Sequence, residues 1–227
     1  GKHIILKGTI HEDKLIQAVI HFAANTNLRD SFDNPIDYYN NNVLETINLL
    51  DVLCHQKIKL LSKNNQPIPI IFSSSCATYG LPEKLPINEE APQNPISPYG
   101  RTKLIVEMML KDLSKASNLK CIILRYFNAA GASSDGFYGE DHKKETHLIP
   151  LTINSALGLS KKINIFGLDH ETFDGSCIRD YVHVDDLAEA HILALKKIQE
   201  ELSPNKIYKS HKGLLEENCF EYNIGLE

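Results

Sequence analysis

The residues best suited to chemistry in this sequence are Tyr99 and Lys103, a phenol and an amine separated by four positions. If the segment is helical, this spacing places both side chains on the same face. A phenol has a pKa of about 10 in water, and a neighbouring cation lowers that pKa because it stabilises the phenolate. A phenolate is a base that can take a proton from a substrate hydroxyl. The pair therefore predicts proton transfer by Tyr99, assisted by the charge of Lys103.

The sequence around the pair predicts the helix that it needs. Ser97 is a favourable N-cap residue, and Pro98 is favourable at the first helical position. An apolar stripe at helical spacing follows, formed by Ile105, Met108, Met109 and Leu113. These features place Tyr99 at the start of the helix and Lys103 about one turn later.

An apolar run at residues 68–72 predicts a buried strand of a parallel sheet, which breaks into the small residues of 73–80. Ligands of open α/β sheets bind beyond the carboxyl ends of the strands. Ser75 follows the run and precedes the helix. We therefore expect its hydroxyl to lie close to Tyr99 and Lys103.

Strands and helices alternate along the whole chain. Further strands are predicted at residues 18–24 and 120–126. Helices are predicted from Asn34 onward, at residues 148–157, and after Asp185, which we interpret as an N-cap. This alternation predicts an α/β fold whose parallel strands are joined by right-handed crossovers.

Four longer motifs follow the tyrosine and lysine in order. They are RYFNAAGA at residues 125–132, IFG at 165–167, DGSCIRDYVHVDDLA at 174–188 and YNIG at 222–225. With Ser75, Tyr99 and Lys103, they make the chain resemble the UDP-glucose 4-epimerase family, extended members of the short-chain dehydrogenase/reductase superfamily. The resemblance runs from about residue 18 to residue 225. It implies a Rossmann-like, doubly wound parallel sheet with a partial small substrate-binding lobe.

The resemblance also implies NAD as cofactor and a UDP-sugar as substrate. The implied reaction is the interconversion of UDP-glucose and UDP-galactose in galactose metabolism, by oxidation at C4 to a 4-keto sugar and reduction on the opposite face. By the same resemblance, Tyr99 would be the base, Lys103 would lower its pKa and bond the nicotinamide ribose, and Ser75 would bind the sugar oxygen.

Further binding residues are implied in the same way. The implied cofactor-binding residues are Phe22, Ala23, Ala24, Asn41, Tyr99, Lys103 and Phe127. The implied substrate-binding residues are Ser75, Asn128, His147, Leu148, Asn164, Ile165, Phe166 and Arg179. A guanidinium can bond two phosphate oxygens at once, so Arg179 is suited to the diphosphate. An ion pair with Asp174 or Asp180 is the alternative interpretation of Arg179.

The resemblance further implies that the chain lacks both ends of the family pattern. The family carries a glycine-rich turn for the cofactor pyrophosphate before the position of residues 7–10, and it continues beyond Gly225. We therefore expect residues 1–127 to be an NAD-binding Rossmann-like region that is incomplete at its N-terminus. Residues 128–227 would be a mixed region, incomplete at its C-terminus, that contributes to UDP-sugar binding and supplies the last strands of the sheet.

The residues after Ser75 distinguish epimerases from the dehydratases and decarboxylases of the same superfamily. Sugar-nucleotide dehydratases and decarboxylases of the superfamily carry an acidic residue there, whereas this chain has Cys76 and Ala77. Elimination of water needs a general acid that neither residue supplies, so epimerisation is favoured. Two alternatives stay open. One is an epimerase for UDP-arabinose or UDP-glucuronate, and the other is a non-catalytic remnant that binds a nucleotide sugar or acts as a dimer partner.

The composition excludes several other classes. The 227 residues are 42% hydrophobic with a formal net charge of −5, which argues against a nucleic-acid-binding or basic membrane surface. No run reaches the roughly 18 apolar residues of a membrane helix. The five cysteines are scattered without a Cys-x-x-Cys pair, so we expect neither a disulfide framework nor a metal site. We expect a cytoplasmic protein, and the resemblance implies a homodimer.

Overall fold

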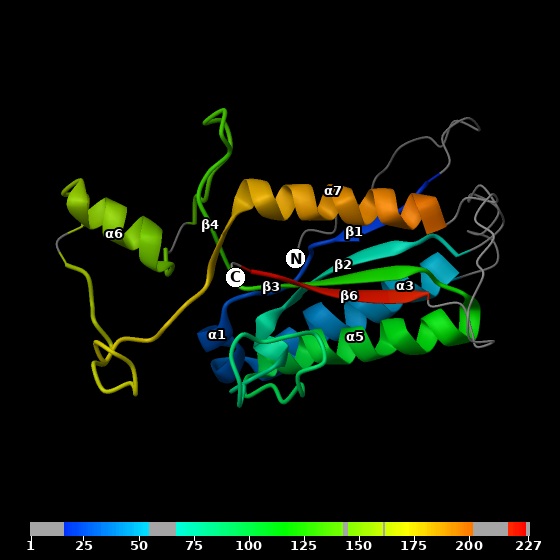
Figure 1. Ribbon diagram of the computed structural model, residues 1–227, viewed down its shortest axis with the longest axis horizontal. Coiled ribbons are helices and arrows are strands. Elements are labelled where there is room, and N and C mark those ends of the chain that lie inside the picture. The colour runs from blue at the N-terminus through cyan, green and yellow to red at the C-terminus, as the bar shows by residue number, and fades with distance from the viewer. Residues whose placement is uncertain (1–15, 55–66, 143–144, 161, 202–217, 226–227) are drawn as a thin grey trace.

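The computed structural model describes residues 16–54, 67–142, 145–160, 162–201 and 218–225. Within these residues, the main sheet contains four parallel strands in the order β1-β2-β3-β6 (Figure 1). They are β1 (Val19–His21), β2 (Ile70–Ser75), β3 (Cys121–Tyr126) and β6 (Cys219–Ile224). A second, two-stranded parallel sheet pairs β4 (Asn128–Ala130) with β5 (Tyr181–His183).

Helices cover both faces of the main sheet. α3 (Glu45–Cys54) and α5 (Pro98–Ser117) lie on one face, and α7 (Val184–Glu201) lies on the other (Figure 1). α6 (Leu148–Ala156) lies apart from these layers, beyond the carboxyl ends of the strands. The shorter elements are α1 (Leu28–Asp33), α2 (Pro35–Tyr38), the π-helical turn η1 (Tyr39–Leu44) and the 3₁₀ turn η2 (Cys76–Thr78). The predicted class, a doubly wound α/β parallel sheet, is confirmed.

Two apolar layers hold the helices to the sheet, because successive side chains of a strand point to opposite faces. Ile70 and Phe72 of β2 pack with Leu110 of α5 in one layer. Ile71 packs with Ile198 of α7 in the other layer. A strand that is buried on both faces reads as a continuous apolar run, which holds for the first half of β2, residues 70–72, whereas residues 73–75, predicted to follow the strand, in fact continue it. Burial of each such side chain contributes roughly 1.5–3 kcal/mol.

The helix predicted after Ser97 is confirmed as α5. The Ser97 hydroxyl oxygen accepts a hydrogen bond from the backbone N–H of Gly100 (3.1 Å), so Ser97 is the N-cap. Asn118 ends the helix in the left-handed conformation, with φ at 58°. The predicted apolar stripe is wrong at Met108, which is 56% exposed. Val106, two positions earlier, is buried instead, since a helix turns by about 200° over two residues.

Other element boundaries also differ from the predictions. β1 covers Val19–His21 and is shorter than the predicted strand at 18–24. α7 begins at Val184, so Asp185 lies in its first turn and is not the N-cap. His183 precedes the helix, and its Nδ1 accepts a hydrogen bond from the backbone N–H of Asp185 (3.2 Å). Among the residues described, no helix combines the length and the apolar character needed to cross a bilayer.

The regions predicted at residues 1–127 and 128–227 both contribute to the main sheet. β6 continues the sheet beside β3, with Cys121 opposite Cys219 and Tyr126 opposite Ile224. α7 covers the face opposite to α5. The predicted boundary between the two regions stays a prediction, and the first part of the N-terminal region, residues 1–15, lies outside the described residues.

Candidate active site

The carboxyl end of β2 meets the start of α5. Ser75 is the last residue of β2, and its Oγ accepts a hydrogen bond from the backbone N–H of Ala77 (3.2 Å). Gly100 permits the close approach of α5, because a Cβ there would lie 2.5 Å from the carbonyl oxygen of Ala77. Tyr99 precedes this glycine and hydrogen-bonds the Ser75 side chain. The structure thus brings the predicted Ser75 and Tyr99 together.

Lys103 lies one turn further along α5 and is almost fully buried, with 4% of the residue exposed. Its Nζ donates a hydrogen bond to the carbonyl oxygen of Ser73 (2.7 Å) and lies 4.9 Å from the ring centroid of Phe72. Nζ also lies 5.8 Å from the ring centroid of Tyr99. Burial lowers the pKa of Lys103 to about 8, against the opposing effect of the Glu107 carboxylate. The amine is therefore mostly charged at neutral pH.

The electrostatics of Tyr99 differ from the sequence prediction. Burial raises the pKa of Tyr99 above its ordinary value, and the hydrogen bond with Ser75 offsets only part of the rise. The lowering that we predicted from Lys103 is not found in this structure. Burial depends on the packing of distant segments, so the four-residue spacing could not predict its effect. In this arrangement the phenol is neutral at pH 7.

The buried amine makes stability depend on pH in a testable way. The pKa of Lys103 is about 8 in the folded chain, against an ordinary value of 10.5, so between these values the unfolded chain binds more protons. Lys103 should therefore make the stability of the wild-type chain rise with pH relative to that of Lys103→Met across this window, because the raised thiol pKa values of Cys76 and Cys121 act in the opposite direction equally in both chains. Urea unfolding at several pH values in the window would measure both slopes. Equal slopes would contradict the lowered pKa.

Three consecutive serines connect the end of β2 to its surroundings. Ser73 hydrogen-bonds Nε2 of the buried His191 of α7 (3.0 Å), whose Nδ1 donates to the carbonyl oxygen of Leu187 (2.7 Å). The Ser74 hydroxyl donates a hydrogen bond to the carboxylate of Glu107 on α5. Ser75 hydrogen-bonds Tyr99, also on α5. The strand end is thus bound to the helix layers on both faces of the sheet.

A buried ion pair joins β3 to α5 beside the carboxyl end of β2. Arg125 of β3 and Glu107 of α5 are both 0% exposed, and Nη2 and Nε of Arg125 donate to the two carboxylate oxygens of Glu107 (2.6 and 3.0 Å). Arg125 Nη1 donates to the Tyr79 hydroxyl (2.9 Å), which donates in turn to Oδ1 of Asn223 (2.7 Å). The carboxylate of Glu221 on β6 also pairs with Arg125. This network joins α5, β3, β6 and the segment after η2.

The sequence prediction missed the residues that support the site from within. The sequence could have predicted that Glu107 is close to the site, because Glu107 follows Lys103 by four positions and so lies on the same face of the helix. A carboxylate on the buried face of a helix needs a cationic partner. The identity of that partner, Arg125, follows only from the pairing of β3 with β2. His191 likewise has no local signal for its contact with Ser73.

The predicted cofactor residues gather at the carboxyl edge of the main sheet. Phe22, Ala23 and Ala24 follow β1, and Phe22 is 57% exposed with its ring 4.6 Å from that of His191. Phe127 follows β3 and packs beside Gly225, where an added Cβ would lie 3.1 Å from the Phe127 ring. Both groups lie at the strand ends where ligands of parallel sheets bind.

Asn41 is connected to the same edge of the sheet by hydrogen bonds through the side chain of Asn42. Its Nδ2 donates a hydrogen bond to Oδ1 of Asn42 (2.9 Å). The buried Asn42 accepts the backbone N–H of Asn25 (2.7 Å) and donates to Oγ1 of Thr102 (3.0 Å). η1 is thereby fixed between the loop after β1 and the helix that carries Tyr99. Asn41 therefore lies at the edge of the sheet where the prediction placed it, and its role in binding the cofactor stays a prediction.

Two of the predicted substrate residues lie where β4 and β5 meet. Asn128 opens β4, and its Nδ2 donates a hydrogen bond to the carbonyl oxygen of Asp180 (2.9 Å). Arg179 is exposed, and its Nη1 donates to the carbonyl oxygen of Ile178 (2.8 Å). Burial raises the thiol pKa of Cys76, the neighbour of Ser75, to about 11, and the charge of Arg179 offsets a small part of that rise. The structure therefore brings Arg179 toward the end of β2.

The remaining predicted substrate residues belong to the part of the chain around α6. His147 and Leu148 stand at the start of α6, and both are exposed. In the segment of Asn164, Ile165 and Phe166, the two apolar side chains are 73% and 88% exposed. The structure does not pack these two side chains against the site at the end of β2. Their predicted contact with the uracil stays a prediction.

Comparison with known proteins gives a consistent result. Residues 6–209 match the family described as "NAD dependent epimerase/dehydratase family". The chain is 49% identical over 195 residues to a UDP-glucose 4-epimerase of Lactobacillus helveticus, and 46% identical over 196 residues to one of Halalkalibacterium halodurans. Each match covers 86% of this chain and 56% of the relative. The chain thus spans about half the length of these curated relatives.

Solved structures resemble the fold as well. A UDP-glucose 4-epimerase from Brucella ovis in complex with NAD superposes with a TM-score of 0.77 and 46% identity, over 92% of this chain and 57% of the other. One from Bifidobacterium longum in complex with NAD+ and UDP gives a TM-score of 0.74 and 37% identity, over 92% and 56% of the two chains.

Proposed function

Because this chain belongs to the NAD dependent epimerase/dehydratase family, we propose that it carries the catalytic residues for NAD-dependent interconversion of UDP-glucose and UDP-galactose. The observation that carries the proposal is the meeting of Ser75, Tyr99 and Lys103 at the carboxyl edge of a parallel sheet. Relatives at 46–49% identity that are named UDP-glucose 4-epimerase support this choice of reaction.

Tyr99 is the proposed proton acceptor for the sugar 4-hydroxyl. The phenol is neutral in this structure, so it must first pass its own proton to solvent water before it can take one from the substrate. The charge of Lys103, 5.8 Å from the Tyr99 ring centroid, favours the phenolate once the proton has left. Ser75 already hydrogen-bonds the phenol and can bind the same sugar oxygen as negative charge develops on it.

The residues at the sheet edge fit an NAD molecule. An exposed aromatic ring at Phe22 and the small side chains of Ala23 and Ala24 can accept an apolar, planar group. Asn41, Lys103 and Phe127 complete the proposed set. When bound, NAD would supply the nicotinamide that accepts a hydride from C4 and returns it. The chain's own contribution is to hold the sugar C4 in reach and to manage the hydroxyl proton.

The diphosphate of the substrate is assigned to Arg179, with Asn128 beside it. Arg179 is exposed, and its charge acts on Cys76 next to Ser75, so a phosphate bound there would lie on the side of the site where Ser75 ends β2. His147, Leu148, Asn164, Ile165 and Phe166 are assigned to the nucleoside. This assignment requires the part of the chain around α6 to close over the substrate. A homodimer in the cytoplasm is part of the same proposal.

The proposal is tested by two measurements on the purified chain. NAD released by acid would be quantified by its mass and absorbance, and UDP-galactose would be supplied with added NAD while UDP-glucose is measured by chromatography. Formation of UDP-glucose supports the proposed reaction. If NAD and UDP-galactose both bind and no UDP-glucose forms, the chain is the non-catalytic binding protein considered as an alternative.

A further inference from the structure

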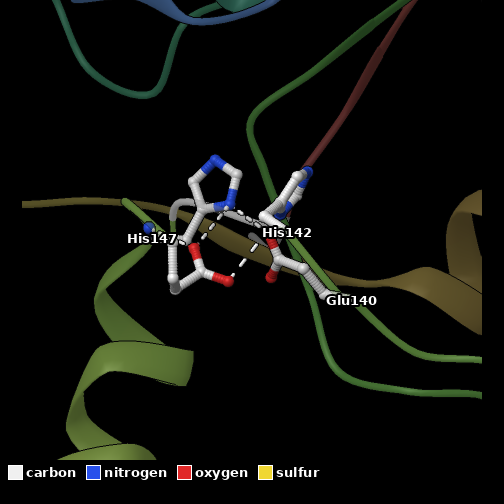
Figure 2. Close-up of side chains that lie close together, drawn as sticks. Glu140, His142 and His147 are labelled. Carbon is white, nitrogen blue, oxygen red and sulfur yellow. Dashed lines mark hydrogen bonds and ion pairs between the residues drawn. The ribbon is translucent and has the colours of Figure 1, made fainter. Parts of the chain in front are cut away.

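Four side chains that can bind a metal converge in the segment before α6. They are Glu140, His142, Glu145 and His147, and one ligand atom of each lies within 4.8 Å of all the others. Figure 2 shows the imidazoles of His142 and His147 directed toward the carboxylate of Glu140. The centroids of the two imidazole rings lie 5.4 Å apart, and the edge of one ring faces the other. Two nitrogens and two carboxylates thus share one small volume.

We propose that these four residues form a zinc-binding site. A tetrahedral site with bonds of about 2.0–2.1 Å requires ligand atoms about 3.4 Å apart. Nδ1 of His142 lies 3.0 Å from Oε1 of Glu140 and 3.7 Å from Oε2 of Glu145, and Nδ1 of His147 lies 3.6 Å from Oε1 of Glu145, so the two histidines face different oxygens of that carboxylate. These separations bracket the required value. Nδ1 of His147 also hydrogen-bonds Glu140 at a separation shorter than two zinc ligand atoms can have, so this contact must widen by about 1 Å to admit the ion.

The chemistry of the ligand set selects the ion. Imidazole nitrogen binds Zn²⁺ and other late transition metals, whereas Mg²⁺ and Ca²⁺ prefer oxygen ligands alone. Two carboxylates balance the charge of one divalent cation when both imidazoles are neutral. Metal ligands must be deprotonated, so binding of Zn²⁺ requires both Nδ1 atoms to carry no proton.

One ligand is already oriented by the backbone. Oε1 of Glu145 accepts hydrogen bonds from the backbone N–H groups of Thr146 and His147, both at 2.7 Å. These bonds hold the Glu145 carboxylate in a fixed orientation. Bonding of this kind around a ligand is what fixes its geometry in metal sites. The absence of cysteine from the set explains why cysteine spacing in the sequence predicted no metal.

The position of the site suggests a structural role. His147 immediately precedes α6, and Glu140 and His142 belong to the segment that leads to it. A bound ion would therefore fasten the start of α6 to that segment. The inference does not rest on the proposed reaction, because all four ligands can be tested by metal binding alone, but it assigns the His147 imidazole to the ion and not to the nucleoside.

The test is a titration of the metal-free full chain with Zn²⁺ followed by calorimetry, and with Co²⁺ followed by visible absorption. We expect one equivalent to bind, with the intense absorption of tetrahedral Co²⁺. His142→Ala and Glu140→Gln should each weaken Zn²⁺ binding at least about tenfold, on the scale seen when a single contributor to a metal site is lost. The matched control is His170→Ala, which removes an exposed histidine outside the cluster and should leave affinity unchanged.

Two results would overturn the proposal. One is failure of the wild-type chain to bind Zn²⁺ more tightly than His142→Ala does, which would leave the four residues as histidine–glutamate ion pairs. The other is an equal loss of affinity in His170→Ala, which would show scattered surface binding. Circular dichroism of each variant would be compared with the wild type, and Glu140→Gln provides a nearly isosteric second variant if His142→Ala fails to fold.

Discussion

Replacing Arg125 with methionine is expected to lower the free energy of unfolding by about 3–5 kcal/mol, the range for removing one partner of a buried ion pair. Arg125 and Glu107 are both fully buried and share three hydrogen bonds at 2.6, 3.0 and 3.1 Å. Without the guanidinium, the Glu107 carboxylate must remain buried without its counter-charge or take up a proton. Equilibrium unfolding in urea, monitored by circular dichroism, measures the loss.

The two partners should not be equivalent in this experiment. Glu107→Gln should cost less than Arg125→Met, because Arg125 keeps its ion pair with Glu221. Met108→Ala is the matched control on the same helix, since Met108 is 56% exposed, and it should change stability by no more than about 0.5 kcal/mol. If Arg125→Met and Met108→Ala destabilise the chain equally, the ion pair contributes nothing to the fold.

Replacing Tyr99 with phenylalanine is expected to reduce epimerisation at least about 10²-fold, the lower end of the contribution of a general base. The substitution removes only the hydroxyl, which hydrogen-bonds Ser75. Loss of that hydrogen bond should cost no more than about 1.5 kcal/mol of stability. NAD content should remain near that of the wild type, because Lys103 and the residues after β1 are unchanged.

The measurement is the rate at which UDP-galactose becomes UDP-glucose, in preparations matched for bound NAD. Tyr138→Phe is the control, because it removes a hydroxyl from a tyrosine that is 75% exposed and outside the site. The control should keep the wild-type rate. An undiminished rate in Tyr99→Phe would remove Tyr99 from the mechanism and leave Ser75 as the remaining hydroxyl at the proposed reaction centre.

Local signals in the sequence were sufficient for the main elements. The Ser97 cap and the proline after it predicted the start of α5, and uninterrupted apolar residues predicted β3 and the first half of β2, because each signal depends on neighbours in the chain. Met108 was misplaced because apolar residues occur on both sides of α5. Asp185 was misplaced because His183, a residue seldom expected to cap a helix, accepts the backbone hydrogen bond instead.

The features that the sequence could not predict depend on contacts between distant segments. Arg125 and Glu107 are neighbours only because β3 lies beside β2 and α5 packs on both strands. The raised pKa of Tyr99 comes from burial, which no local spacing encodes. The four ligands before α6 are close in sequence, yet their convergence needs a particular path of the backbone between them. Prediction from sequence was therefore strongest where a single element carried the signal.

The three serines that end β2 have a mechanical consequence. Ser73 is tied to α7, whereas Ser74 and Ser75 are tied to α5. The tip of the strand cannot tilt toward one helix without stretching a bond to the other. Ser75 is therefore held in place by the sheet and by the helices on both of its faces, although it lies at the edge of the sheet. An error of about 1 Å in the placement of a reacting group can cost a factor of 10² in rate, and bracing from both sides guards against such an error.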